Sequence, residues 1–183
     1  MEPATGTAIM DNSNEQTIVG SDGVIDLSLD VLEKAIDYKF KDRSLLKEAI
    51  THCSVKAENG VHVKTNVRLE LLGDSILGFL VSDYLYRKYP EANKSNLTDK
   101  RKLLVSNDAL NRLGFARGES GSFLYDLMIK GGSIEHNNNR AVNMVADTVE
   151  SIIAAIYLDR GLESARAFVM EMIVGDIDCL GVK

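Results

Sequence analysis

The chain has 183 residues, of which 45% are hydrophobic, and its 21 basic and 27 acidic residues give a net charge of −6. This length and composition predict one globular domain with a largely aliphatic core. No apolar run could span a membrane, and the N-terminus resembles neither a signal peptide nor a transit peptide, so we expect a soluble, intracellular protein with no membrane partner. Cys53 and Cys179 do not have the spacing of metal ligands.

The excess of acidic residues lies at the N-terminus. Residues 1–30 contain six acidic residues and no basic ones, so the rest of the chain has 21 of the 27 acidic residues and all 21 basic ones. The first residues are also rich in Ser, Asn, Thr and Gly. We therefore predict a flexible acidic tail over residues 1–27 and a folded domain over residues 28–183. Any anion-binding surface of that domain must arise from clustering of basic residues.

Apolar residues at helical spacing predict an all-α fold. Asp42 is expected to cap the second helix, and Pro90 to end the third. Residues 91–96 resemble a polar loop, and Val61 and Val63 give only a weak indication of a strand. The expected helices, in chain order, are residues 27–38, 43–53, 66–90, 97–113, 124–130, 141–158 and 162–173.

Two carboxylates interrupt the apolar pattern of the third helix. Glu70 and Asp74 are four residues apart, which places both on one helix face. Buried acids must be paired, protonated or bound to a metal, and the nearest basic residue on this helix is Arg68. The pair alone does not decide the matter, because such acids are often solvated or paired with a base elsewhere in the fold.

A second acid pair, Asp147 and Glu150, occupies the apolar helix predicted at residues 141–158. If the two helices face each other, four carboxylates would repel one another unless a cation lay between them. Carboxylate oxygens suit Mg²⁺ or Mn²⁺ better than Zn²⁺. The alternative is that each pair forms caps or ion pairs on a different surface, and spacing alone leaves both possibilities open.

Other candidate site residues are weaker. Lys100, Arg101 and Lys102 could contact phosphates, or they could form an ordinary solvated helix face. His52 and Cys53 are expected to be structural, with Cys53 in the core. No Ser or Cys nucleophile with a nearby His and acid is apparent, and neither is a phosphate-binding glycine loop.

The segment Asn66-Val-Arg-Leu-Glu-Leu-Leu-Gly-Asp-Ser resembles the signature of the ribonuclease III family, endonucleases of double-stranded RNA. The resemblance covers roughly residues 28–173. It implies an all-helical endonuclease domain that works as a homodimer and leaves 5′-phosphates and short 3′ overhangs. The other matching stretches, in the same order as in the family, are Tyr38 to Leu46 with Ala49 to His52, Leu97 to Gly114, and Ala146 to Glu150 with Ala155 to Asp159.

By this resemblance, four acids would be catalytic and would bind Mg²⁺, for which Mn²⁺ could substitute. A metal can activate water and stabilise the charge that develops during phosphodiester hydrolysis. Gly73 would leave room for close helix packing or for the substrate backbone. Leu71 stands where the family often has a Phe that inserts into the partner subunit, so it is expected at the dimer interface. The four predicted ligands are Glu70, Asp74, Asp147 and Glu150.

Two departures from the family pattern favour another interpretation. Val67 and Lys94 stand where the family usually has acids, and we expect no double-stranded-RNA-binding domain after the nuclease-like region. The alternative is therefore a weakly active or inactive domain that binds structured RNA or an RNA–protein assembly. Retention of all four predicted ligands favours an enzyme. We expect either form to recognise the A-form shape of the duplex rather than its sequence.

Overall fold

The computed structural model describes residues 21–55, 63–115, 123–131 and 138–171, and the regular structure in these ranges is helical. The all-α prediction is therefore confirmed. None of the described helices is both long enough and apolar enough to cross a membrane. The helices are α1 (Ser21–Ala35), α2 (Arg43–Ile50), α3 (Val67–Lys88), α4 (Lys94–Leu104), α5 (Asn107–Phe115), α6 (Phe123–Leu127), α7 (Asn138–Arg160) and α8 (Leu162–Val169).

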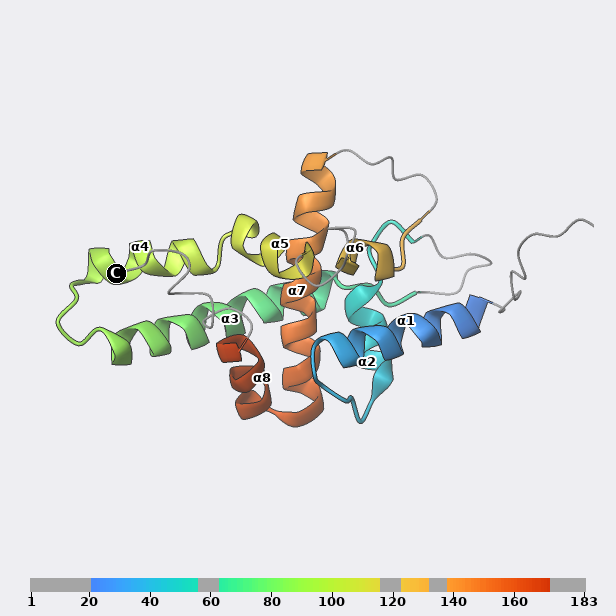
Figure 1. Cartoon of the computed structure of the whole chain (residues 1–183), viewed down its shortest axis with the longest axis horizontal. Helices are drawn as coiled ribbons and strands as arrows, with labels where there is room; N and C mark the ends of the chain where they lie inside the picture. The colour runs from blue at the N-terminus through green and yellow to red at the C-terminus, as the bar shows by residue number, and fades with distance from the viewer. Residues whose placement is uncertain (1–20, 56–62, 116–122, 132–137, 172–183) are drawn as a thin grey trace, which may run out of the picture.

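Helix α7 is the centre of the fold. Figure 1 shows it crossing α3, with α2, α5 and α8 packed around it. The segment from Ile152 to Ile156 is buried throughout, and two consecutive alanines in it, Ala154 and Ala155, let neighbouring helices approach closely. Leu77 and Leu80 of α3 have no exposed surface either. The predicted apolar faces of these two helices therefore meet in one core.

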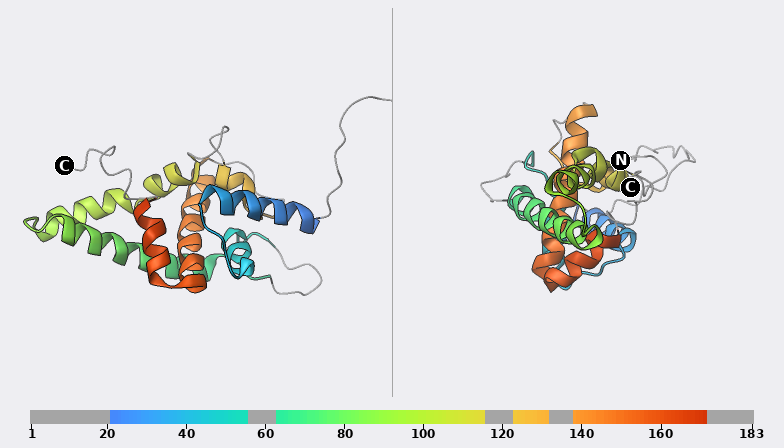
Figure 2. Two further views of the ribbon diagram at one scale, coloured as in Figure 1. Left: turned by 60° about the horizontal axis from the view of Figure 1, so that its bottom comes forward. Right: turned by 90° about the vertical axis from the view of Figure 1, so that its left-hand side faces the viewer.

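The second half of α3 extends away from this core. In Figure 1 and the left view of Figure 2 it forms an arm together with α4, which runs beside it after the turn at Pro90. Asn93 begins α4, because its side-chain oxygen accepts a hydrogen bond of 2.9 Å from the backbone N–H of Asn96. At the start of α2, the predicted cap is confirmed: the Asp42 side chain accepts a bond from the N–H of Ser44.

Several predicted boundaries were wrong. The first helix begins at Ser21, so residues 21–27 of the expected tail are helical. The single helix expected over residues 97–113 is two helices, because the helical backbone is interrupted at Val105 and Ser106. At the start of α5, the Ser106 hydroxyl accepts a hydrogen bond from the backbone N–H of Ala109. Leu103, within the helix expected over residues 97–113, is 54% exposed.

The segments around α2 and α6 meet without forming a sheet. Thr51 and Ile129 form an isolated bridge, and Val63 lies outside any described strand; Val61 lies outside the described residues. The expectation that Cys53 lies in the core was wrong, because it is exposed just after α2. His52 is structural as expected, with its Nδ1 atom 2.8 Å from the Ser54 hydroxyl.

Candidate metal centre

The crossing of α3 and α7 is a contact between backbones. A Cβ atom added to Gly73 would lie 1.8 Å from the carbonyl oxygen of Glu150 and 2.4 Å from its carbonyl carbon. No side chain fits at these distances, so only glycine permits this approach. Of the two roles expected for Gly73, the structure has the first, close helix packing.

Three of the four sequence-predicted acids meet beside this contact. Glu70 of α3 and Asp147 and Glu150 of α7 each offer an oxygen atom, and these three oxygens all lie within 4.8 Å of one another. Glu70 therefore faces the acid pair of α7 across the helix crossing. We call these three residues the acidic cluster.

The fourth acid, Asp74, lies at the edge of the cluster. It is one turn beyond Glu70 on α3, its side chain is exposed, and it is not one of the three residues whose oxygens converge. Its charge is nevertheless close enough to raise the pKa of Glu150. Asp74 therefore acts on the cluster from its solvent side.

Burial and mutual repulsion shift the titration of the cluster. Burial, followed by the charges of Asp74, Asp147 and Glu70, raises the pKa of Glu150 from 4.5 to about 8. Burial and the charge of Glu70 raise the pKa of Asp147 from 3.8 to about 6. The ion pairs found among the described residues involve none of these acids. A cation at the cluster would relieve this repulsion.

The donor set of the cluster suits a hard divalent cation. It consists of carboxylate oxygens from two helices, and no described His or Cys joins it. Mg²⁺ and Mn²⁺ prefer such ligands, whereas structural and catalytic Zn²⁺ sites usually include nitrogen or sulfur. The residues present therefore fit the metal that the sequence predicted.

Two residues that the sequence analysis missed connect the helices next to the cluster. The hydroxyl of Ser151 donates to the carbonyl of Asp147 at 2.7 Å and lies 3.3 Å from the carbonyl of Asn66, which it also bonds. Both Ser151 and Asn66 are buried. In the sequence, the clues to these two residues were that Asn66 directly precedes one acid-bearing helix and that Ser151 directly follows Glu150 in the other.

The predicted basic strip lies elsewhere. Lys100, Arg101 and Lys102 are on α4, beside the second half of α3 rather than at the α3–α7 crossing (Figure 1). Their side chains diverge because neighbouring helical residues point about 100° apart. Lys100 lies over the Tyr89 ring, Arg101 bonds the Ser82 hydroxyl, and Lys102 pairs with Asp99.

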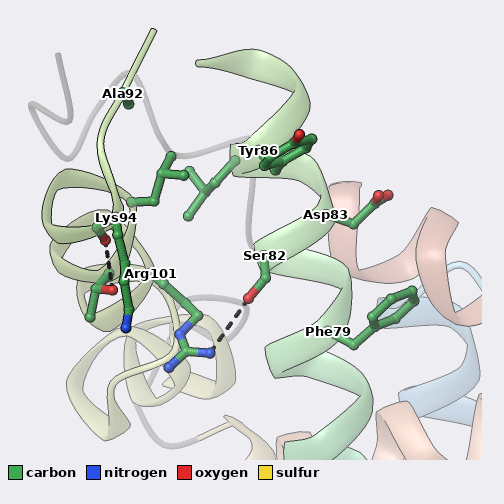
Figure 3. A pocket seen from close by; sticks show the side chains of 10 residues that line it. Phe79, Ser82, Asp83, Tyr86, Ala92, Lys94 and Arg101 are labelled. Atoms are coloured by element: carbon green, nitrogen blue, oxygen red, sulfur yellow. Dashed lines mark hydrogen bonds between the residues drawn. The ribbon is translucent and has the colours of Figure 1, made fainter. Parts of the chain in front are cut away.

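A cavity of about 710 Å³ opens between α3 and α4 (Figure 3). Phe79 and Tyr86 of α3 line it, and Arg101 reaches across it from α4 to Ser82. Phe79 is 54% exposed and Tyr86 is 72% exposed. Leu71, at the other end of α3, is 73% exposed, so three large apolar side chains are exposed along this helix.

Comparison with known proteins places this geometry in context. Residues 42–177 match a family model described as Ribonuclease-III-like. The chain is 41% identical over 143 residues to Ribonuclease 3 of Aliivibrio fischeri, covering 78% of this chain and 60% of that protein. It is 39% identical over 150 residues to Ribonuclease 3 of Caldanaerobacter subterraneus, covering 82% and 64%. The chain thus spans about three fifths of the length of these relatives.

Solved structures agree with the sequence matches. The nuclease domain of ribonuclease III from Campylobacter jejuni superposes with a TM-score of 0.68 and 30% identity, over 80% of this chain and 96% of that domain. That structure is described as flexible in the region involved in its dimer formation. Dicer from Giardia has a TM-score of 0.64 at 24% identity, over 87% of this chain and 21% of Dicer, and shares the fold.

Proposed function

Because the chain belongs to the ribonuclease III family, we propose that it is a divalent-metal-dependent endoribonuclease that cleaves double-stranded RNA. The observation that carries this proposal is the acidic cluster, in which Glu70, Asp147 and Glu150 converge from two helices. The relatives named Ribonuclease 3 support the reaction type. The products would carry 5′-phosphates and short 3′ overhangs, as the family resemblance implies.

The four acids have distinct roles in this proposal. Glu70, Asp147 and Glu150 would hold Mg²⁺ or Mn²⁺ directly or through water, and Asp74 would complete the site from the solvent side. When bound, the ion would polarise the phosphate and lower the pKa of water. Glu150 would give up its proton on metal binding, since its pKa is about 8 without a cation. The Gly73 contact would keep the carboxylates of the two helices at a fixed separation.

We also propose that the protein works as a homodimer. The large apolar side chains of Leu71, Phe79 and Tyr86 are exposed along α3, and a second copy would cover them. A two-fold interface is self-complementary, so each subunit would present the same helix to the other. Each subunit would then supply one acidic cluster, and the two clusters would cut opposite strands of the duplex.

Contacts to the RNA backbone would come from basic side chains on α4. Lys94, Lys100, Arg101 and Lys102 all lie on this helix. Binding through phosphates would weaken as salt rises. Recognition would depend on the shape of the A-form duplex and its 2′-hydroxyls.

One observation favours a second candidate function, RNA binding with little cleavage. Val67 is 49% exposed at the start of α3, and Lys94 is exposed at the start of α4, at the two positions where the family resemblance predicts acids. Loss of both acids could reduce turnover while the basic residues still bind structured RNA or an RNA–protein assembly.

The two functions are separated by incubating long duplex RNA with the protein and Mg²⁺, Mn²⁺, Ca²⁺ or EDTA. The nuclease proposal expects cleavage with Mg²⁺ and Mn²⁺, and none with EDTA. Single-stranded RNA of the same sequence is the substrate control, and Glu150→Gln is the protein control. Binding of the duplex in a gel-shift assay without cleavage in Mg²⁺ or Mn²⁺ would favour the second function.

A further inference from the structure

Asn66, the residue before α3, has a buried carboxamide without a partner. The residue is 1% exposed, and neither its side-chain oxygen nor its side-chain nitrogen makes a hydrogen bond within the described structure. Buried polar groups are normally paired, because an unpaired donor or acceptor loses its hydration without compensation. The position of this side chain therefore requires an explanation.

Capping of α3 does not explain the buried, unpaired carboxamide of Asn66. An Asn before a helix usually has an extended backbone, and its side chain accepts a bond from the first turn. Asn66 instead has helical angles, φ −64° and ψ −16°, and makes no side-chain cap bond. Its backbone holds it in place: its N–H donates to Thr51, and its carbonyl accepts bonds from the N–H of Glu70 and the hydroxyl of Ser151.

Asn66 is next to the acidic cluster on both helices. It lies one turn before Glu70, and side chains of an α-helix lean towards its N-terminus, so Glu70 extends over the turn that contains Asn66. On the other side, the Ser151 hydroxyl joins the carbonyl of Asn66 to that of Asp147. The unpaired carboxamide is thus on the helix face of Glu70, and the backbone of Asn66 is joined to the backbone of Asp147 beside the cluster.

We infer that Asn66 is a positioning residue of the metal centre, whose carboxamide binds water in the hydration shell of the divalent ion. This inference rests on the proposed metal site. Mg²⁺ and similar ions retain several waters when carboxylates bind them. A water can satisfy both the donor and the acceptor of a carboxamide. Such groups outside the direct ligands commonly contribute about 10- to 100-fold to metal affinity.

The test is Asn66→Leu, which keeps the approximate size of the side chain and removes its hydrogen bonds. We would measure the dissociation constant for Mn²⁺ by electron paramagnetic resonance of the free ion, and the melting temperature in EDTA. The inference expects Mn²⁺ binding to weaken by about 10- to 100-fold while the melting temperature in EDTA is unchanged or higher. The inference would be overturned if the variant melts at a lower temperature in EDTA, or partly fails to fold, while its folded fraction binds Mn²⁺ with wild-type affinity. That combination is the pattern of a purely structural role.

Asn111→Leu is the matched control. Asn111, on α5, is the other described residue with a buried carboxamide lacking a partner, at 6% exposure, and it is not on either acid-bearing helix. We expect its substitution to leave Mn²⁺ affinity unchanged, and an equal loss in both variants would overturn the inference. If the wild type fails to bind Mn²⁺, the metal centre itself is refuted. If the wild type and Asn66→Leu bind Mn²⁺ equally, only the role of Asn66 is refuted.

Discussion

The Cα atom of Gly73 faces the carbonyl group of Glu150 so closely that even a methyl group would overlap it. This contact couples two properties of the molecule. It sets how near α3 and α7 approach, and it fixes the backbone of the most strongly perturbed carboxylate of the cluster. A change at Gly73 should therefore affect both stability and metal binding.

Gly73→Ala should destabilise the protein by about 1–3 kcal/mol or more, because the helices must separate to admit the methyl group. Urea denaturation measures this change, and Mn²⁺ titration should show weaker binding. Gly78→Ala is the control on the same helix, since a Cβ there would have no neighbour within 4 Å. It should stabilise the protein by about 0.5–1 kcal/mol, as alanine does inside helices. Equal stability of Gly73→Ala and the wild type would contradict the close contact.

Removing single charges tests the four acids. Glu150→Gln should reduce cleavage at least about 100-fold, because metal catalysis contributes several kcal/mol to lowering the barrier. Asp74→Asn should also stop cleavage but should weaken Mn²⁺ binding less, since Asp74 lies outside the converging three. Circular dichroism would verify the fold, and a gel-shift assay would verify duplex binding. Wild-type cleavage by either variant in saturating Mg²⁺ would refute its assigned role.

The stability of the metal-free protein should fall as pH rises from about 4.5 to about 8. In that range the folded state keeps protons on Glu150 and Asp147, whose pKa values are about 8 and about 6, whereas the unfolded chain releases them near 4.5 and 3.8. Hydrogen bonds from Arg87 and Arg166 lower the pKa of Asp83, so its contribution changes only at more acidic pH. Melting temperatures in EDTA across this range provide the measurement.

Two controls accompany the pH series. Glu150→Gln should flatten most of the decline, because Gln carries no proton to release. Mg²⁺ should raise the melting temperature by an amount that grows with pH, since the ion competes with protons for the same oxygens. A melting temperature in EDTA that rises steadily between pH 5 and 8 would contradict the raised pKa of Glu150.

Leu71→Asp should convert the proposed dimer into a helical monomer. A two-fold interface would contain this substitution twice, and each desolvated charge costs several kcal/mol in order of magnitude. Light scattering over a concentration series measures the mass, and a duplex with labelled ends reports cleavage of each strand. Leu158→Asp is the control, because Leu158 of α7 is 50% exposed but lies off the α3 surface. A wild-type monomer that cuts both strands would refute the dimer.

The helices and the positions of the acids were accessible from the sequence because both follow helical periodicity. Spacing of four between Glu70 and Asp74, and of three between Asp147 and Glu150, defines a face regardless of tertiary structure. Whether the two faces meet depends on packing, which the sequence indicated only through small residues such as Gly73 and Ala154. Gly73 allowed two roles, and only the structure shows its contact with Glu150.

Other features depend on tertiary contacts that leave no local pattern. Leu104 and Leu110 fit one continuous helix or two, so the break at Val105 was invisible in the apolar spacing. Cys53 was assigned to the core from its residue type, but it follows the end of α2 and faces solvent. Asn66 resembled an ordinary residue at a helix start, and its burial results from Thr51 and Ser151, which are distant in sequence.

The acidic cluster also has a consequence for biosynthesis. Its carboxylates come from α3 and α7, and α4, α5 and α6 lie between them in the chain. Glu70 therefore emerges from the ribosome before Asp147 and Glu150 do. Domains fold as units once all their parts have emerged. On the proposed function, the nascent polypeptide carries only part of a catalytic site during this interval. That nascent chain would itself cleave no structured RNA until α7 has left the exit tunnel.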